Sequence, residues 1–181
     1  AIGVYEFIRL KKYTKAVLTI SLVLFVINFY IYLNNLYLLY PVRYSKDWQY
    51  GNKQVVEYIK NNQDKYDLIV FTRHYGEPHI FTLFNLKYDP AKFQSLMNME
   101  RFETFDWVRV LRFDKYYFPD LGDDGTRYED IVKESSFEPN ILFRPRRILF
   151  VGKSGDFPPE AKILERINFL DGTEAFEITT N

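Results

Sequence analysis

The sequence predicts an α/β protein in which one transmembrane helix precedes a small α/β domain that ends in an antiparallel hairpin. Three observations predict this. Residues 16–40 contain no charged side chain. In residues 43–181, helical patterns alternate with short apolar runs of strand length. The dipeptide Asp171-Gly172, which favours a tight turn, separates the last two of these runs.

The uncharged segment 16–40 is long enough to span a bilayer. As a helix it extends about 37 Å, against a hydrocarbon thickness of about 30 Å. Tyr37 and Tyr40 stand near its end, where the amphipathic rings of tyrosine favour the membrane interface. A cleaved signal peptide is the alternative, but bulky Leu and Tyr residues stand where cleavage requires small ones. The segment therefore predicts an uncleaved span.

Basic residues before the span predict its orientation. Short basic segments stay in the cytoplasm, and the positive side chains here are Arg9, Lys11, Lys12 and Lys15. We therefore expect residues 43–181 to lie outside the cytoplasm. Residues 1–15 begin with the apolar run AIGVYEFI, which indicates the end of a preceding membrane helix followed by a basic cytoplasmic loop. This interpretation predicts a multi-pass protein of the cell membrane, and an interfacial N-terminal stub is the alternative.

The outer domain is expected to contain helices and strands in alternation. Helices are predicted where apolar residues recur at helical spacing or where proline opens the segment: 51–62, 77–86 and a short one from Asp89-Pro90. Strands are predicted at apolar or alternating runs: 67–72, 107–113, 147–151, 163–169 and 175–179.

This order of elements resembles a truncated Rossmann-like domain with a partly parallel sheet. Ligands of such sheets bind outside the carboxyl ends of the parallel strands, which here are followed by residues 72–77 and 152–156. The two loops are therefore the predicted ligand crevice. Fold analogy alone does not fix the ligand or the reaction.

Composition excludes several classes of function. Lys plus Arg and Asp plus Glu both number 24, so there is no net basic field to attract nucleic acid. The absence of cysteine excludes disulfides and thiolate metal sites, and it fits an extracytoplasmic domain stabilised by packing alone. Aromatic residues make up 19% of the chain, which predicts a core and a surface rich in rings.

Two motifs that suggest ligands fail in detail. Gly152-Lys153-Ser154 follows a strand like the end of a phosphate loop, but Arg147 stands where that loop needs glycine. The run PDLGDDGTRYED suggests calcium, yet the required spacing puts Gly122 and Ile131 at ligand positions. We therefore predict a solvated acidic loop, and we expect neither a cofactor nor a metal.

The two histidines of the chain fall together in RHYGEPHIF, with Glu77 between His74 and His79. These spacings are compatible with three roles. One is a structural turn that sets up the following helix, the second is ligand contact, and the third is metal binding. Pro78 interrupts a helical face shared by the two histidines, which disfavours the metal.

Three segments together carry a resemblance to a known family: YPVRYSKDWQYGNKQVVEYIK, YDLIVFTRHYGEPHIFTLFNLKYDPAKFQ and INFLDGTEAFEI. They resemble the C-terminal region of bacterial family 39 glycosyltransferases, relatives of protein O-mannosyltransferases and aminoarabinose transferases. The likeness covers the last span and nearly all of the outer domain. Its motifs are Trp48-Gln49-Tyr50-Gly51, Tyr75-Gly76-Glu77-Pro78 and Tyr88-Asp89-Pro90, none of which is a catalytic signature.

The resemblance implies a polytopic enzyme that transfers a sugar from a polyprenyl-phosphate donor on the outer face of the membrane. The family's catalytic acidic motif lies in the first external loop, which these 181 residues do not include, so no catalytic residue is carried over. The fragment alone is expected to be inactive. Its expected partners are membrane lipid and, through the membrane part, the lipid-linked donor, while the acceptor stays open.

Two functions from different classes follow. In the first, the outer domain caps the membrane-embedded active site and orients the acceptor. Its expected contact surface consists of Trp48, Tyr50, Arg73, His74, Tyr75 and Glu77. In the second, the chain is a single-pass, membrane-anchored module that binds a ligand or partner with no enzyme attached.

Overall fold

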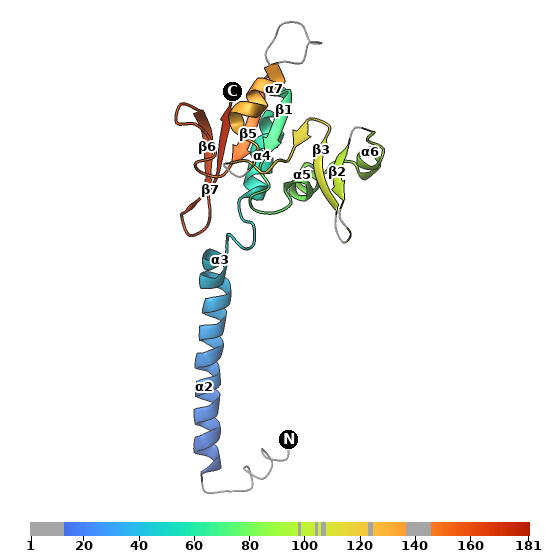
Figure 1. The fold of residues 1–181 in the computed structure, drawn as a ribbon. Helices are drawn as coiled ribbons and strands as arrows, with labels where there is room; N and C mark the ends of the chain where they lie inside the picture. The colour runs from blue at the N-terminus through green and yellow to red at the C-terminus, as the bar shows by residue number, and fades with distance from the viewer. Residues whose placement is uncertain (1–12, 98, 104, 106–107, 123–124, 137–145) are drawn as a thin grey trace. The chain divides into compact units, whose positions relative to one another are not determined.

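A computed structural model describes residues 13–97, 99–103, 105, 108–122, 125–136 and 146–181. The chain divides into two compact units, Ala1–Tyr44 and Ser45–Asn181 (Figure 1). The preceding membrane helix and most of the basic loop predicted for residues 1–15 lie outside the described residues, as does Trp107 of a predicted strand. Each unit is considered by itself below.

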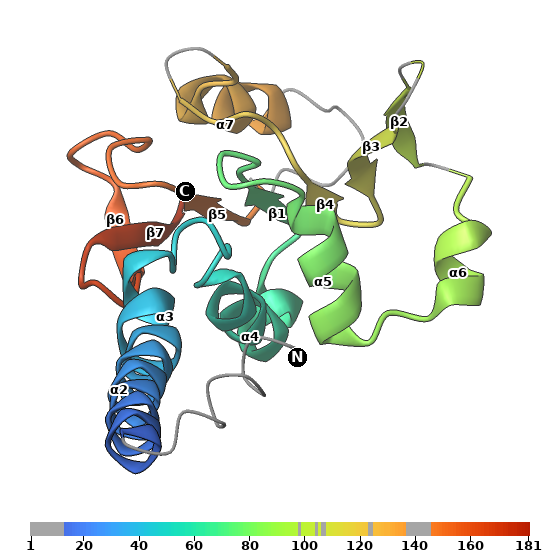
Figure 2. The same ribbon diagram turned by 90° about the horizontal axis from the view of Figure 1, so that it is seen from below.

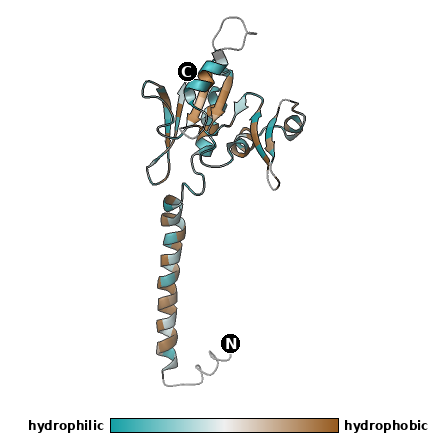
Figure 3. Cartoon of the chain, in the orientation of Figure 1, coloured by the Kyte–Doolittle hydropathy of each residue, from teal (hydrophilic) through white to brown (hydrophobic). Residues whose placement is uncertain are grey.

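The first unit is a continuous helix in three parts: α2 (Thr14–Asn34), the π-helix η1 (Asn35–Leu39) and α3 (Tyr40–Arg43). This helix has 30 residues, from Thr14 to Arg43, and lies near the N-terminus. Among the described residues, it is the one helix that is long and apolar enough to cross a membrane. None of its apolar window is buried. Figure 3 shows many apolar residues, coloured brown, along α2. The helix includes the predicted segment 16–40 and extends slightly beyond both of its ends.

The π-helical turn has a local cause in Pro41. Proline has no N–H, and its ring crowds the carbonyl four residues earlier, here that of Tyr37. A wider turn relieves this crowding. Accordingly, the N–H of Tyr40 donates to the carbonyl of Asn35, five residues back. The helix continues through the proline as α3, with Pro41 in its first turn.

The second unit contains a seven-stranded mixed sheet in the order β2-β3-β4-β1-β5-β7-β6. The strands are β1 (Leu68–Phe71), β2 (Glu100–Glu103), β3 (Val108–Phe113), β4 (Tyr116–Tyr117), β5 (Ile148–Gly152), β6 (Lys162–Asn168) and β7 (Glu174–Thr180). The strand β1 runs parallel to β4 and to β5, whereas all other neighbours pair antiparallel. The predicted α/β class is confirmed.

Helices cover both faces of this sheet. They are α4 (Asn52–Asn62), the short 3₁₀-helix η2 (Gln63–Lys65), α5 (Pro78–Leu86), α6 (Pro90–Gln94) and α7 (Tyr128–Ser136). Figure 2 shows α4 and α5 on one face of the sheet and α7 on the opposite face. The unit is therefore layered helix, sheet, helix.

Alternation along the central strands produces a separate core on each face. Ile69 and Phe71 of β1 pack with Val55, Val56 and Ile59 of α4. Val70, the residue between them, packs instead with Leu121 and with Ile131 of α7. Strand β5 alternates in the same way, and all these side chains are buried. This double burial explains why β1 and β5 are continuous apolar runs in the sequence.

Three elements differ from the sequence-based expectation. Strand β2 is exposed along its whole length and carries Glu at both ends, so it has no apolar pattern to predict it. Strand β4 has two residues, too few for any periodicity. The acidic loop predicted for residues 119–130 is shorter than expected, because Tyr128, Glu129 and Asp130 form the first turn of α7. Acidic side chains in a first turn interact favourably with the helix dipole.

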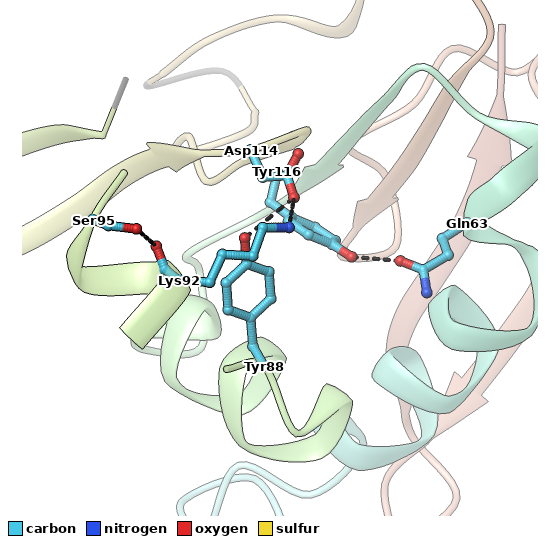
Figure 4. Close-up of polar contacts among 6 residues, drawn as sticks. All are labelled: Gln63, Tyr88, Lys92, Ser95, Asp114 and Tyr116. Carbon is cyan, nitrogen blue, oxygen red and sulfur yellow. Dashed lines mark hydrogen bonds and ion pairs between the residues drawn. The ribbon is translucent and has the colours of Figure 1, made fainter. Parts of the chain in front are cut away.

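Polar contacts close the sheet at the amino ends of β1 and β4 (Figure 4). The hydroxyl of Tyr116 donates to Gln63 Oε1 at 2.6 Å. In the β3–β4 turn, the Asp114 carboxylate accepts from the Tyr88 hydroxyl at 3.2 Å and from Lys92 Nζ at 3.4 Å. Burial, followed by the charge of Asp114, raises the pKa of Tyr116 far above its ordinary value. Internal contacts thus hold the amino ends of these strands, and the candidate site lies at the carboxyl ends.

Candidate functional site

A cleft lies at the carboxyl ends of the three parallel strands β4, β1 and β5. Its volume is about 850 Å³, within the range of small-molecule sites. Three loops line it, which follow β1, β4 and β5 in turn. Its polar lining includes Arg73, His74, Asp120, Lys153, Ser154 and Asp156. The cleft thus joins the two loops predicted from the sequence, 72–77 and 152–156, with a third loop after β4.

Backbone hydrogen bonds fix the first loop between its two neighbours. The N–H of Thr72 donates to the carbonyl of Val151 at 2.9 Å, and the N–H of Arg73 donates to that of Pro119 at 3.0 Å. The hydrogen bonding of β1 therefore continues past its last residue, Phe71, by one residue toward β5 and by two residues toward the loop after β4. Because both bonds are to main chain, Arg73 emerges at a fixed position between the other two loops.

An ion pair joins the first and second loops. The Arg73 Nη2 atom lies 2.6 Å from Asp120 Oδ2, although the two residues are 47 positions apart in the chain. The Arg73 side chain is only 11% exposed, whereas that of Asp120 is 60% exposed. The guanidinium is thus largely shielded from solvent, whereas the carboxylate is exposed to solvent in the cleft.

The third loop is organised around the Asp156 carboxylate. Its Oδ2 atom accepts from the N–H of Lys153 at 2.9 Å, while the N–H of Asp156 donates to the Lys153 carbonyl at 3.1 Å. Glycine makes room for this carboxylate: a Cβ on Gly152 would lie 2.9 Å from Oδ2, and a Cβ on Gly122 would lie 3.2 Å from Oδ1. Asp156 therefore stands between the second and third loops.

An aromatic wall borders the same cleft. The ring of Tyr128, at the start of α7, packs 4.6 Å from that of Phe150 and 5.9 Å from that of Phe157, measured between centroids. Burial, followed by the charges of Glu129 and Glu160, raises the pKa of Tyr128. The phenol is therefore neutral at physiological pH. Tyr128 and Phe157 add apolar surface to the lining of the cleft.

Glu77, a predicted contact residue, lies outside the cleft in a second polar cluster. Its Oε2 atom is 3.4 Å from His79 Nδ1, and its Oε1 atom is 3.3 Å from Arg109 Nε on β3. Burial lowers the pKa of His79; Glu77 opposes this shift and Arg73 adds to it. His79 also packs edge-on against Phe118. The cluster joins the start of α5 to the sheet.

The other predicted residues are spread over the domain. Tyr75 packs edge-on against Phe169 at 5.4 Å and Phe176 at 5.1 Å, and burial raises its pKa. Tyr50 is partly buried against the same core, while Trp48 is 70% exposed. Of the six predicted contact residues, Arg73 and His74 line the cleft, and the other four do not.

Sequence reasoning missed Asp120 and Asp156 as cleft residues. Asp120 follows β4, which has two residues. So short a strand cannot be recognised in the sequence, so the position of Asp120 at the carboxyl ends of the parallel strands could not be predicted. Asp156 stands just after Gly152-Lys153-Ser154, and it lies within the predicted crevice loop. The available signal was the incomplete phosphate motif Gly152-Lys153-Ser154. In the structure the Asp156 carboxylate accepts from the N–H of Lys153, where a bound anion would accept in a phosphate loop.

The chemistry available in the cleft is hydrogen bonding between charged side chains and a polar ligand. Within the described ranges, no group of three or more His, Asp or Glu side chains could hold a metal ion. The cleft offers cationic donors from Arg73 and Lys153 and carboxylate acceptors from Asp120 and Asp156. These donors and acceptors are suited to binding a polar ligand.

Comparison of the chain with protein-family models, with curated proteins and with solved structures gives no match.

Proposed function

We propose that this chain is the C-terminal part of a multi-pass membrane glycosyltransferase that uses a polyprenyl-phosphate sugar. In this proposal the outer domain is not catalytic itself, and it binds and orients the acceptor beside the membrane-embedded active site. The proposed location is the cell membrane, with the domain outside the cytoplasm. The resemblance of the three sequence segments motivates the enzyme class.

The observation that carries the binding role is the cleft. It opens where a sheet with parallel strands β4, β1 and β5 binds ligands by the general rule for such folds. All the described residues that line it belong to the second unit and lie between Arg73 and Pro158. The helix Thr14–Arg43 supplies a segment suited to membrane anchoring.

The same layering supports the Rossmann-like relationship expected from the sequence, which stays part of this proposal. The antiparallel pairing of β6 with β7 supports the expected C-terminal hairpin. Trp48, Tyr50, Tyr75 and Glu77 stay candidate contacts outside the cleft, with Trp48 offering the most exposed ring.

A transfer assay on the complete enzyme tests the proposal. Asp120→Asn keeps the size of the side chain and removes its charge, and we expect it to lower transfer at least tenfold, because a hydrogen bond to a charged group is lost. Asp64→Asn, an exposed change before β1, is the matched control and should transfer at the wild-type rate. Wild-type transfer by Asp120→Asn, with equal expression, would refute a role for the cleft.

The second candidate is a single-pass, membrane-anchored binding module. The cleft favours it equally, since the described lining residues all come from the second unit. Counting the membrane spans encoded upstream of Ala1 in the gene separates the two. Several spans with acidic residues in the first external loop support the transferase, and a start codon beside Ala1 supports the module.

A further inference from the structure

The geometry points to a neutral, hydroxyl-rich ligand for the cleft, of the class of a monosaccharide or the end of a glycan. This inference rests on the proposed role of the cleft in ligand binding, and it adds the chemical class of that ligand. Three features of the described lining carry it: the lack of concentrated positive charge, the internal carboxylate in its third loop, and the presence of both polar and aromatic side chains.

The described lining residues do not concentrate positive charge. Their cationic side chains are Arg73, Arg127 and Lys153, and their anionic side chains are Asp120, Glu129 and Asp156. Sites for phosphates and nucleotides concentrate positive charge, because the ligand brings several negative charges. The described part of the lining carries as many carboxylates as cations, so it creates no such field. It therefore favours a polar ligand over a phosphate.

The place for an anion in the third loop is already filled. Phosphate loops bind their ligand through backbone N–H groups that follow a strand. Here the N–H of Lys153 donates to the Asp156 carboxylate at 2.9 Å, and that of Asp156 donates to the Lys153 carbonyl. A phosphate at this point would meet an amide already in use and a like charge beside it. The loop thus excludes the ligand that its sequence suggests.

The Arg73–Asp120 pair suits hydroxyl groups. A hydroxyl both donates and accepts, so it can donate to a carboxylate while accepting from a neighbouring guanidinium. Asp120 is 60% exposed and presents its carboxylate to the cleft, whereas the Nε atom of Arg73 is shielded from solvent. The exposed part of the pair is thus mainly an acceptor. Neighbouring hydroxyls on a ring match such a carboxylate, whereas a ligand carboxylate would be repelled.

The aromatic wall supplies the complementary apolar contact. Sugars present C–H groups on their ring faces and hydroxyls at their edges, so they bind between an aromatic surface and polar side chains. The lining of this cleft contains the aromatic side chains of Tyr128 and Phe157 together with the polar side chains of Asp120, Arg73 and Asp156. Both kinds of contact are therefore available to one ligand.

Saturation-transfer NMR on the full chain in lipid nanodiscs tests the inference. The probes are the methyl glycosides of glucose, galactose, mannose and N-acetylglucosamine, with inorganic phosphate and glycine as charged and zwitterionic probes. We expect at least one glycoside to bind, and its affinity to fall at least tenfold in Asp120→Asn. Asp64→Asn, with the same chemical change away from the cleft, should bind as the wild type does. Phosphate and glycine should not compete.

A second variant covers misfolding of the first. Asp156→Asn keeps an oxygen that can accept from the N–H of Lys153, so it should preserve the loop and still weaken glycoside binding. Thermal unfolding monitored by circular dichroism shows which variants are folded. Binding of no glycoside overturns the inference, and so does displacement of a glycoside by phosphate. Undiminished binding by both folded variants overturns it as well.

The two proposals fail in different ways. If glycosides do not bind but Asp120→Asn abolishes transfer by the complete enzyme, the ligand class is wrong and the transferase proposal stands. If glycosides bind and Asp120→Asn transfers normally, the sugar-binding cleft stands, and its role in the transfer reaction is refuted.

Discussion

At the scale of single residues, the buried polar groups beside the cleft determine how the domain responds to acid. His79 is buried against Phe118, with Glu77 at 3.4 Å and Arg73 contributing positive charge from the cleft side. Burial lowers the pKa of His79 below its ordinary value of about 6.5. The unfolded chain therefore binds a proton in a pH range where the folded chain does not. This difference makes stability depend on pH.

We predict that the domain loses stability as the pH falls below about 6.5, and that His79→Gln reduces this loss. The contribution of His79 is complete above the pKa of the unfolded histidine and disappears as the pH falls toward the lower pKa of the folded one. Urea unfolding of the full chain in detergent at pH 7, 6 and 5 measures it. His74→Gln, at the exposed histidine, is the control and should keep the wild-type acid sensitivity. Equal slopes for wild type and His79→Gln would contradict the prediction.

Glu77 shows why residue-level prediction of a site is harder than prediction of a strand. The sequence places it four residues after Arg73, in the same loop. Its carboxylate nevertheless turns to His79 and Arg109, a residue on β3. Arg73 turns instead to Asp120. Arg109 is 32 positions from Glu77, and Asp120 is 47 positions from Arg73, so spacing within the loop cannot reveal these partners.

At the scale of elements, β1 and β5 could be predicted because burial on both faces requires apolar side chains at successive positions. Helices α5 and α6 carry their own start signal in a proline of the first turn. By contrast, β2 exposes every residue and β4 has two residues, so tertiary pairing alone defines them. Asp120 depends on β4 for its position. Because β4 could not be predicted, the role of Asp120 in the ion pair of the cleft could not be predicted either.

Gly51 at the start of α4 illustrates a constraint that one residue places on an element. Its φ of 102° is a region that other residues rarely adopt, and an added Cβ would lie 3.1 Å from the Phe176 ring. We predict that Gly51→Ala destabilises the domain by about 2 to 3 kcal/mol, from backbone strain and crowding together. Urea unfolding of the full chain measures the change.

The matched control is Gly172→Ala. Gly172 has a φ of 86° and nothing within 4 Å of its added Cβ, so this variant reports the backbone strain without the crowding. We expect its loss of stability to be smaller by about 1 kcal/mol or more. Equal losses for the two variants would show that the Phe176 ring moves aside freely.

At the scale of the whole molecule, we predict that the helix Thr14–Arg43 anchors the chain in the membrane. Its large apolar side chains are exposed along its length, as a lipid-facing surface requires. Leu24→Arg together with Val26→Arg should abolish insertion, because each arginine near the centre of a span costs about 2.5 to 3.5 kcal/mol. Carbonate extraction of membranes from expressing cells measures it.

The matched control for insertion is Leu24→Phe together with Val26→Leu, which keeps the segment apolar and should leave the chain in the membrane pellet. Retention of the double-arginine variant in the pellet would indicate that another part of the chain holds it there.

The cleft also connects binding to the folding of the whole domain. Arg73 and Asp120 are 47 positions apart, and the third loop begins after β5, so the lining exists only once the sheet has closed around β1. The unfolded chain consequently offers no such site, and by mass action any occupant stabilises the native state. At a concentration 100 times its dissociation constant, a ligand adds about 2.7 kcal/mol. The melting temperature of the domain is therefore a detector for its own ligand, and it identifies that ligand without an assay of catalysis.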